Sequence, residues 1–226
     1  MYRSSFSSEF KVLEKLGEGS FAEVFKVKST RNNGSSLFAI KRLKKRFHSV
    51  DEVNRLTEIT TCQLLQGHPN VVRLFDVLYD STHGYVALVF ELLDCNLYEY
   101  VKGRGRPCDE RQSLLFIYQL LKAISYLHSK NIFHRDVKPE NCMVNKNTLE
   151  LKLVDFGSCR VDDHGGNFDN FYTEYVSTRW YRAPECILTS GLYGKAVDIW
   201  AVGCMLYELL TTRPLFPGKH ELDQIS

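Results

Sequence analysis

The chain has 226 residues and a formal net charge of +2, and 44% of its residues are hydrophobic. That length suits one large domain or two small lobes, and the apolar content is enough for a sizeable core. A charge so close to zero argues against a general nucleic-acid-binding protein. No apolar run approaches the roughly 20 residues of a membrane span, and the Ser-rich N-terminus lacks the apolar centre of a signal peptide.

Seven cysteines are dispersed along the chain, without a C-x-x-C pair or a neighbouring histidine cluster. An odd, scattered set predicts thiols in a reducing compartment, not a disulfide framework or a zinc site. We therefore expect a cytosolic or nuclear protein. The basic run at 41–46 (KRLKKR) allows two interpretations: a nuclear-targeting or polyanion-binding patch, or a strand end followed by a solvated loop, which is the usual fate of short charge runs.

Strands dominate the first part of the chain. Alternating apolar residues predict strands between Phe10 and Phe47, broken by glycines at 17 and 19 and by a hairpin turn at Asn33-Gly34. A helix from Asp51 to Leu65 is expected next, with Asp51 as its N-cap, followed by strands around 71–77 and 85–90. These residues predict a mostly antiparallel sheet with one helix.

The apolar period changes after residue 94. One long amphipathic helix that ends near 130–131 is predicted by apolar residues at helical spacing, namely Leu114, Ile117, Leu121, Ile124 and Leu127. The stretch 197–210 is apolar on nearly all sides, which predicts a helix inside a core. Residues 93–96 are the expected hinge between two lobes, 1–92 and 93–226.

Residues 17–24 (GEGSFAEV) resemble the pattern G-x-G-x-x-G-x-V, with Ala22 in place of the third glycine. Strand-like residues follow the pattern directly, whereas its dinucleotide-binding version opens a helix. This favours a strand–turn–strand flap over ATP phosphates, where glycine lets the backbone approach closely; an ordinary hairpin turn is the alternative. The residues assigned to the flap are Leu16, Gly17, Glu18, Gly19, Ser20, Phe21, Ala22, Glu23 and Val24.

Lys41 follows the apolar stretch at 38–40 and is expected on an inner strand. There it can reach the α- and β-phosphates, provided that a carboxylate fixes it, and Glu58 on the predicted helix is the expected partner. The surroundings of the adenine are predicted to be Val24 and Ala39 above it, Met143 below it, the backbone of Glu91 to Leu93 beside it and Phe90 at the rear.

Residues 134–141 (HRDVKPEN) place Asp136, Lys138 and Asn141 at fixed offsets, and Asp155 opens a second motif, DFG, further on. Phosphoryl transfer from ATP needs an acid to orient the attacking hydroxyl, a cation for the moving phosphate and oxygen ligands for magnesium. Residues 142–144 and 151–154 alternate as short strands, so their hairpin returns Asp155 towards Asn141 and puts two oxygen ligands on one face. A structural turn rich in Asp and Asn is the alternative.

Together these motifs make the chain, from about Phe10 to its last residue, resemble the eukaryotic protein kinases. The resemblance implies an α+β, bilobal protein-kinase-like fold, with a small β-rich N-lobe carrying one key helix and a mainly helical C-lobe that lacks its last helices. It implies that Asp136 orients the substrate hydroxyl, that Lys138 stabilises the transferred phosphate, and that Asn141 and Asp155 hold magnesium. ATP and Mg²⁺ are therefore the expected cofactors, gathered by these side chains together with Lys41.

A Thr-Glu-Tyr tripeptide lies at 173–175, between DFG and the APE sequence at 183–185. With 177–185 (STRWYRAPE) it is similar to the CMGC group of MAP, cyclin-dependent and MAK-related kinases, and finer features resemble the MAK-related members. The resemblance implies a proline-directed Ser/Thr kinase, activated when an upstream kinase phosphorylates Thr173 and Tyr175.

Each phosphate would add about −1.5 to −2 charge and seek arginine partners. We pair phosphorylated Thr173 with Arg55 and Arg135, and phosphorylated Tyr175 with Arg179 and Arg182. In the alternative interpretation these arginines bond only to backbone or water.

The resemblance further implies a monomer whose partners are protein substrates with Ser/Thr-Pro sites, with no nucleic acid and no membrane span. The expected location is the cytoplasm, with the nucleus and the cilium as alternatives. The sequence ends soon after 197–210, where kinases add further helices, so we expect exposed apolar surface on that helix. The competing interpretation is a catalytically weak or silent kinase fragment that acts as a nucleotide- or partner-binding module.

Overall fold

The computed structural model describes residues 9–30, 36–161, 179–189 and 193–225. They divide into two compact units. Unit 1 contains the residues up to Gly67 together with Val72–Leu93, and unit 2 contains His68–Val71 together with the residues from Asp94 onward. The four residues at 68–71 thus leave the strand-rich part of the chain and join the helical part.

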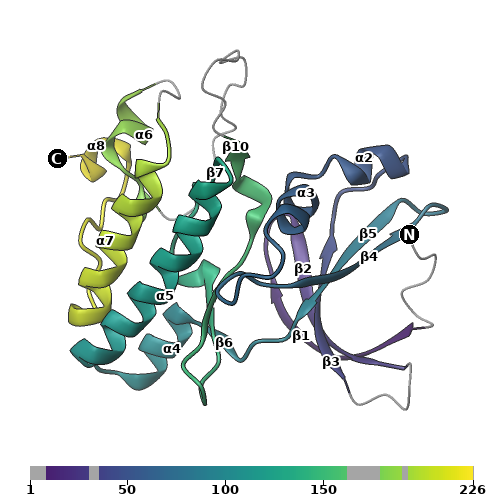
Figure 1. Ribbon diagram of the computed structural model, residues 1–226, viewed down its shortest axis with the longest axis horizontal. Helices are drawn as coiled ribbons and strands as arrows, with labels where there is room; N and C mark the ends of the chain where they lie inside the picture. Colours follow the sequence, from purple (N-terminus) through teal and green to yellow (C-terminus); the bar gives the residue numbers. More distant parts are fainter. Residues whose placement is uncertain (1–8, 31–35, 162–178, 190–192, 226) are drawn as a thin grey trace. The chain divides into compact units, whose positions relative to one another are not determined.

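Unit 1 is built on a five-stranded antiparallel sheet with the strand order β1-β2-β3-β5-β4 (Figure 1). Its strands are β1 (Phe10–Glu18), β2 (Ala22–Ser29), β3 (Leu37–Leu43), β4 (Leu74–Asp80) and β5 (Tyr85–Glu91). Alternation along the strands sends Val27, Ile40 and Val89 to one buried cluster, as the sequence pattern predicts. The predicted turn at Asn33-Gly34 lies outside the described residues.

The strand predicted around 71–77 begins later than expected. Val71 pairs instead with Leu153 of unit 2, and the N–H of Leu153 donates to the carbonyl of Asn70 at 2.9 Å. These bonds explain why residues 68–71 belong to unit 2.

The single helix predicted from Asp51 to Leu65 is wrong, because two helices occupy this stretch: α2 (Val50–Asn54) and α3 (Thr57–Leu64). Between them Leu56 is extended, with φ −61° and ψ 122°. Val53 and Ile59 are both fully buried. On one continuous helix they would point about 120° apart, so the break allows both to reach the core. The N-cap is also Ser49, whose hydroxyl accepts the N–H of Glu52, and not Asp51.

Helices dominate unit 2, where α5 and α7 lie side by side (Figure 1). The helices are α4 (Leu97–Arg104), α5 (Glu110–Ser129), α6 (Pro184–Leu188), α7 (Ala196–Thr211) and α8 (Glu221–Gln224). The predicted long helix is confirmed as α5, but its buried face is centred on Phe116, Leu120 and Ala123. Leu114 and Leu121, which belong to the apolar pattern that predicts this helix, are 52% and 38% exposed because they lie beside that face.

The second predicted helix is confirmed as α7, but it is not buried on all sides. Val197, Ala201 and Met205 are buried, whereas Ile199 and Leu210 are 48% and 41% exposed. The expected exposed apolar surface is therefore present on this helix. Within the described ranges, none of the helices combines the length and the hydropathy that a bilayer crossing requires.

Short strands connect the helices of unit 2 into a platform for the loops that follow. β6 (Cys95–Asn96), β8 (Cys142–Val144) and β9 (Leu151–Leu153) form one sheet, and β7 (Ile132–Phe133) pairs with β10 (Arg160–Val161). Gln119 of α5 holds this platform, since its amide accepts the N–H of Leu151 at 2.9 Å and donates to the carbonyl of Leu149 at 2.9 Å.

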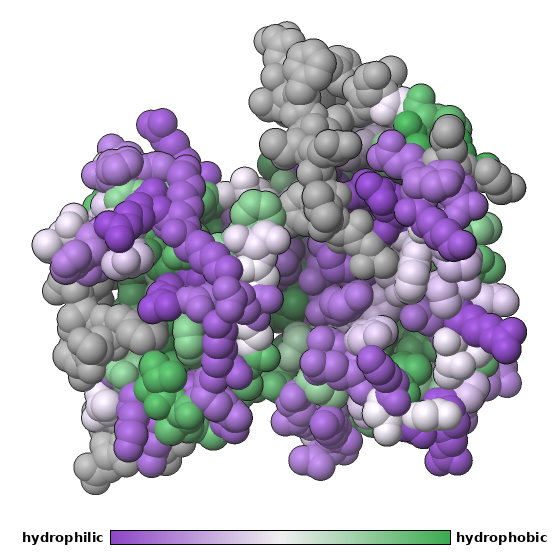
Figure 2. Space-filling model, turned by 180° about the vertical axis from the view of Figure 1, so that it is seen from behind, coloured by the Kyte–Doolittle hydropathy of each residue, from purple (hydrophilic) through white to green (hydrophobic). Residues whose placement is uncertain are grey.

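The surface seen in Figure 2 is mainly hydrophilic, with hydrophobic side chains in smaller areas between the polar ones. All seven cysteines lie among the described residues and none forms a disulfide; Cys186 is half-buried and the others are buried. The expectation of dispersed thiols is confirmed. Together the antiparallel sheet of unit 1 and the helices of unit 2 confirm the predicted α+β class.

Candidate active site

The loop at 134–141 lies between β7 and β8 of unit 2. Ile132 and Phe133 are buried in β7, and a 3₁₀ turn at Pro139–Asn141 leads into β8. These two anchors hold the intervening polar residues at the edge of the platform. The sequence therefore folds the predicted catalytic residues into one short, doubly anchored loop.

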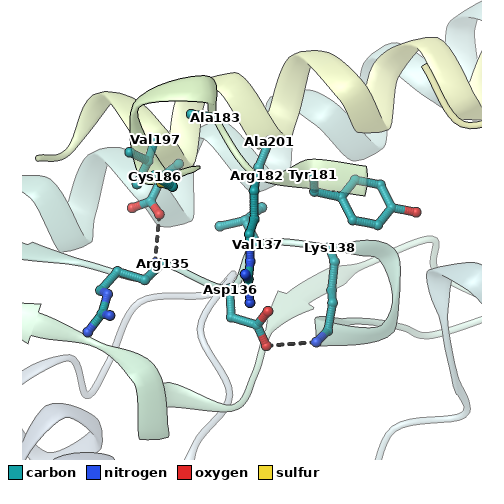
Figure 3. Close-up of a pocket in the computed structure, with 11 residues that line it drawn as sticks. Arg135, Asp136, Val137, Lys138, Tyr181, Arg182, Ala183, Cys186, Val197 and Ala201 are labelled. Carbon is teal, nitrogen blue, oxygen red and sulfur yellow. Dashed lines mark hydrogen bonds and ion pairs between the residues drawn. The ribbon is translucent and has the colours of Figure 1, made fainter. Parts of the chain in front are cut away.

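Three predicted side chains meet in this loop. The ammonium Nζ of Lys138 lies 2.8 Å from Oδ2 of Asp136 (Figure 3). The amide Nδ2 of Asn141 donates to the same oxygen at 2.9 Å. Nδ2 of Asn141 also donates to the backbone carbonyl of Asp136 at 2.8 Å. Asp136 and Lys138 are each 15% exposed at the side chain, so the two donors fix the carboxylate at a partly buried position.

Asp155 follows β9, whose antiparallel pairing with β8 returns the chain to Asn141. Cys142 pairs with Leu153, and the N–H of Val154 donates to the carbonyl of Asn141 at 3.0 Å. The predicted hairpin is thus confirmed. Asp155 itself has a φ of 62° and a ψ of 71°, a left-handed conformation that is uncommon for a residue with a Cβ.

His134 connects the loop to the DFG segment. It is fully buried, its Nε2 lies 3.0 Å from the carbonyl of Val154, and its ring meets that of Phe156 edge-on at 5.5 Å. Its Nδ1 accepts the N–H of Asp136 at 3.3 Å. One imidazole therefore couples the position of Asp136 to that of the segment carrying Asp155.

Asp198 of α7 anchors the same loop, and sequence reasoning missed it. Its oxygens accept the N–H groups of His134 at 2.8 Å and Arg135 at 2.9 Å, and Oδ2 lies 2.8 Å from Nε2 of His128. The side chain is 1% exposed. The sequence did contain an indication of this role, because Asp198 is a carboxylate within an otherwise apolar stretch. A carboxylate buried there needs hydrogen-bond donors around it.

A small pocket of about 20 Å³, room for one water molecule, lies beside Asp136. Its polar lining includes Lys138, Arg135 and Arg182 (Figure 3). Lys138 contacts the Asp136 carboxylate, so the pocket places positive charge next to a group that accepts protons, which suits the binding of an anion.

Tyr181 and Glu208 form a second interaction that the sequence did not indicate. The hydroxyl of Tyr181 donates to Oε2 of Glu208 at 2.6 Å. Burial raises the pKa of Glu208, and burial together with the hydrogen bond to Glu208 raises the pKa of Tyr181 above its usual range. The pair ties the 3₁₀ turn at Arg179–Tyr181 to α7.

In unit 1 the predicted pair between Lys41 and Glu58 is present. Nζ of Lys41 in β3 lies 2.8 Å from both carboxylate oxygens of Glu58 in α3. The lysine and glutamate side chains are 19% and 9% exposed. An ion pair this well shielded holds the lysine in one place, facing away from bulk water.

The flap residues form a strand–turn–strand hairpin, as predicted. β1 ends at Glu18 and β2 begins at Ala22, with the N–H of Gly19 donating to the carbonyl of Ala22 at 2.9 Å. Phe21 is 69% exposed, and Leu16 is 48% exposed. No helix opens after the turn, which removes the dinucleotide-binding alternative for this pattern.

Glutamates of the flap form ion pairs with two of the five basic residues in the run at 41–46. Glu18 lies 2.6 Å from Lys44, and Glu23 lies 2.5 Å from Arg42, while Lys15 contacts both glutamates at 2.5 and 2.8 Å. Hydrogen bonds from Lys15 and Lys44 lower the pKa of Glu18 to about 2. Lys41 and Lys45 pair with Glu58 and Glu52, so four of the five basic residues of the run have a carboxylate partner, and the side chains of Glu18 and Glu23 face cations.

The residues predicted around the adenine belong to both units. Val24 pairs with Lys41, and Ala39 pairs with Phe90, on neighbouring strands of unit 1. Glu91 uses its N–H to donate to the carbonyl of Arg73 at 3.2 Å. Leu93 ends unit 1, and Met143 lies in β8 of unit 2. Their assignment to a nucleotide site stays a prediction.

The arginines predicted to bind phosphate also divide between the units. Arg55 is exposed at the end of α2 in unit 1, whereas Arg135, Arg179 and Arg182 belong to unit 2. The guanidinium of Arg135 lies 5.8 Å from the ring centre of Tyr193, and the N–H of Arg182 donates to the carbonyl of Arg179 at 2.9 Å. The predicted phosphorylation sites, Thr173 and Tyr175, lie outside the described residues.

Several known proteins are similar to this chain. It is 47% identical to the MAPK/MAK/MRK overlapping kinase of Mus musculus over 217 residues, which cover 96% of this chain and 50% of that protein. It is 39% identical to cyclin-dependent kinase F-4 of Oryza sativa subsp. japonica, with 96% and 45% covered, and 40% identical to serine/threonine-protein kinase MAK of Mus musculus, with 96% and 33% covered. The chain thus spans half or less of the length of these relatives.

The family model for the protein kinase domain matches residues 10–226, nearly the whole chain. That match contains the flap, the Lys41–Glu58 pair, the loop around Asp136 and the DFG segment. The relatives come from the MAK-related and cyclin-dependent kinases that the sequence motifs resemble. By motif, by fold and by similarity, this chain belongs to the protein kinase family.

Proposed function

We propose that this chain is a protein serine/threonine kinase, which transfers the γ-phosphoryl group of ATP to a hydroxyl of a protein substrate. The observation that carries the proposal is the cluster in which Lys138 and Asn141 lie 2.8 and 2.9 Å from the same carboxylate oxygen of Asp136, in a loop anchored at both ends. The names of the relatives at 39–47% identity support the same reaction.

ATP and Mg²⁺ use is general to protein kinase domains, and the donor set fits the metal. Both hydrogen bonds of the Asn141 amide leave from Nδ2, so its oxygen is the atom left for a cation. Asp155 supplies a carboxylate one residue beyond Val154, which is bonded to Asn141. Magnesium prefers a few protein oxygens completed by phosphate oxygens and water, and when bound it offsets the charge that develops on the phosphate.

In the transfer, the substrate hydroxyl oxygen attacks the γ-phosphorus and the bond from phosphorus to the β–γ bridging oxygen breaks. Asp136 orients the hydroxyl and accepts its proton. Lys138, next to that carboxylate, meets the negative charge of the moving phosphoryl group. The protein's contribution is therefore positioning and electrostatic stabilisation, which suits a loop whose side chains are already bonded to one another.

We assign Lys41 of unit 1 to the α- and β-phosphates of ATP. Its contact with both carboxylate oxygens of Glu58 holds the ammonium group in one position, which a phosphate ligand requires. The hairpin from Gly17 to Val24 is assigned to the phosphates through its backbone, since the side chains of Glu18 and Glu23 are paired with cations.

Phosphate transfer from radiolabelled Mg-ATP to myelin basic protein tests the proposal, with Asp136→Asn as the inactive control. We expect the wild-type rate to exceed that of Asp136→Asn by on the order of 10²–10⁴-fold, the usual contribution of a positioned acid–base group. Isothermal titration with Mg-ATP shows whether both proteins bind nucleotide. Equal rates with nucleotide still bound contradict the kinase assignment and favour a silent nucleotide-binding module.

We further propose that the kinase is proline-directed and is activated by phosphorylation of Thr173 and Tyr175. Support comes from the arginines: Arg135 and Arg182 line the small pocket beside Asp136, where added phosphate would find cations. With an upstream kinase supplied, Thr173→Ala or Tyr175→Phe should lower transfer to a Ser-Pro peptide. The matched change Tyr172→Phe should not, and full activity in both of the first two variants contradicts the switch.

A further inference from the structure

The outer face of α5 carries a row of alternating aromatic and basic side chains. Tyr118, Lys122, Tyr126 and Lys130 follow one another at four-residue intervals, which places them on one ridge of the helix surface. The ridge runs beside the buried face of α5, whose residues include Phe116 and Leu120. We call these four residues the α5 ridge.

Each lysine of the α5 ridge lies over the ring of the tyrosine one turn before it. Nζ of Lys122 is 5.7 Å from the ring centre of Tyr118, and Nζ of Lys130 is 5.8 Å from that of Tyr126. Such contacts favour one position of the long side chain over its many alternatives. The two ammonium groups are thereby held at spacings set by the helix, with their attachment points about 12 Å apart along its axis.

The charges of this ridge are not neutralised. Across the described ranges, no carboxylate forms an ion pair with Lys122 or Lys130. In unit 1, by contrast, Lys44 and Arg42 are each paired with a glutamate. The two oriented cations of the α5 ridge thus have no carboxylate partner among the described residues, whereas Arg42 and Lys44 of the basic run do.

Neighbouring side chains enlarge the surface. His68 stacks on Tyr126 with ring centres 4.8 Å apart, and burial, followed by the charges of Lys122 and Lys152, lowers the pKa of His68. Lys152 is itself 3.4 Å from Glu150. Tyr118 is 61% exposed, and next to the ridge Leu114 and Leu121 are 52% and 38% exposed. Exposed aromatic and aliphatic groups beside basic ones are typical of protein-binding surfaces.

We propose that the α5 ridge is a docking surface for a protein partner, through a segment that carries acidic side chains interspersed with leucine-like ones. The unpaired ammonium groups of Lys122 and Lys130 would receive the carboxylates, and Tyr118 with Leu114 and Leu121 would receive the apolar side chains. The exposed leucines favour such a peptide over a nucleic acid, whose backbone offers phosphates without aliphatic groups.

Binding of a fluorescein-labelled peptide, Glu-Glu-Leu repeated four times, tests the proposal by fluorescence anisotropy. The neutral analogue with Gln in place of each Glu serves as the control for charge. We expect Lys122→Gln with Lys130→Gln to weaken binding of the acidic peptide about tenfold. We expect Tyr118→Ala to weaken it as well, and the neutral analogue to bind less tightly to the unchanged protein.

Lys102→Gln is the matched control variant, because Lys102 lies 5.4 Å from the ring centre of Tyr98 in the same one-turn arrangement but on α4. It should leave the affinity unchanged. Equal weakening by Lys102→Gln, or equal affinity for the neutral peptide, overturns the proposal. So does tighter binding of an oligothymidylate of equal length, which would mark a general polyanion surface. Unchanged Mg-ATP binding by the ridge variants separates this result from failure of the kinase assignment.

Discussion

Asp198 fixes the backbone of the catalytic loop from within α7. It accepts hydrogen bonds from two consecutive N–H groups, those of His134 and Arg135. Arg135 has a φ of 71°, a left-handed conformation that costs roughly 1–2 kcal/mol for a residue with a Cβ. Hydrogen bonds to a buried carboxylate offset such a cost, so Asp198 positions Asp136 without contacting the substrate.

Replacing Asp198 by alanine is expected to lower the free energy of unfolding of unit 2 by roughly 2–5 kcal/mol, because two buried N–H groups lose their acceptor. Asp198→Asn retains one acceptor oxygen and should lose less. Urea denaturation followed by the fluorescence of Trp180 and Trp200, both in unit 2, measures the change.

Glu110→Gln is the control for Asp198→Ala, because Glu110 is exposed in the first turn of α5. It should change the unfolding free energy by less than about 0.5 kcal/mol. An Asp198→Ala protein as stable as the wild type would show that the loop does not depend on this anchor.

At the level of single elements, α4 shows how a short helix is defined by its ends. Oδ1 of Asn96 accepts the N–H of Glu99 at 2.8 Å, and Oε2 of Glu99 accepts the N–H of Asn96 at 3.2 Å. Gly105 ends the helix in the left-handed conformation with φ 63°. A helix of eight residues is not stable by itself, so these caps and its packing decide where it begins and ends.

Asn96→Ala should therefore lower the free energy of unfolding of unit 2 by about 1 kcal/mol, the usual cost of losing an N-cap. Asn96→Asp keeps an acceptor oxygen at the same place and should restore most of the stability. Both are measured by urea denaturation, with Lys102→Ala as a change in the same helix outside the cap. Equal losses in the Ala and Asp variants would argue against capping as the cause.

Across the whole chain, local patterns predicted most of the elements and the family. The alternation of apolar residues predicted the strands of unit 1, the helical spacing of apolar residues predicted α5, and a stretch that is apolar on nearly all sides predicted α7. The motifs also predicted the pair of Lys41 with Glu58 and the hairpin that returns the chain from Asn141 towards Asp155. These two predictions succeeded because each motif specifies both the type of residue and the strand or helix on which that residue lies.

The errors concern features that depend on distant packing. The break between α2 and α3 arises because Val53 and Ile59 must both reach the core. No pattern in the neighbouring residues indicates that requirement. Leu114 and Leu121 fit the helical period of α5 equally well, yet the surface that α5 covers selects other residues. Asp198 acts on residues 63 and 64 positions earlier, so its role is visible only once α7 lies beside the loop.

The positive φ angles at Arg135 and Asp155 have an evolutionary consequence. Both residues flank the proposed chemistry, and both occupy a backbone region that β-branched side chains avoid. Valine, isoleucine and threonine are therefore disfavoured at these positions on steric grounds alone, even in a descendant that has abandoned phosphoryl transfer. Invariance there would record backbone geometry as much as reactivity, and drift towards glycine or asparagine would be the first substitution that such a descendant tolerates.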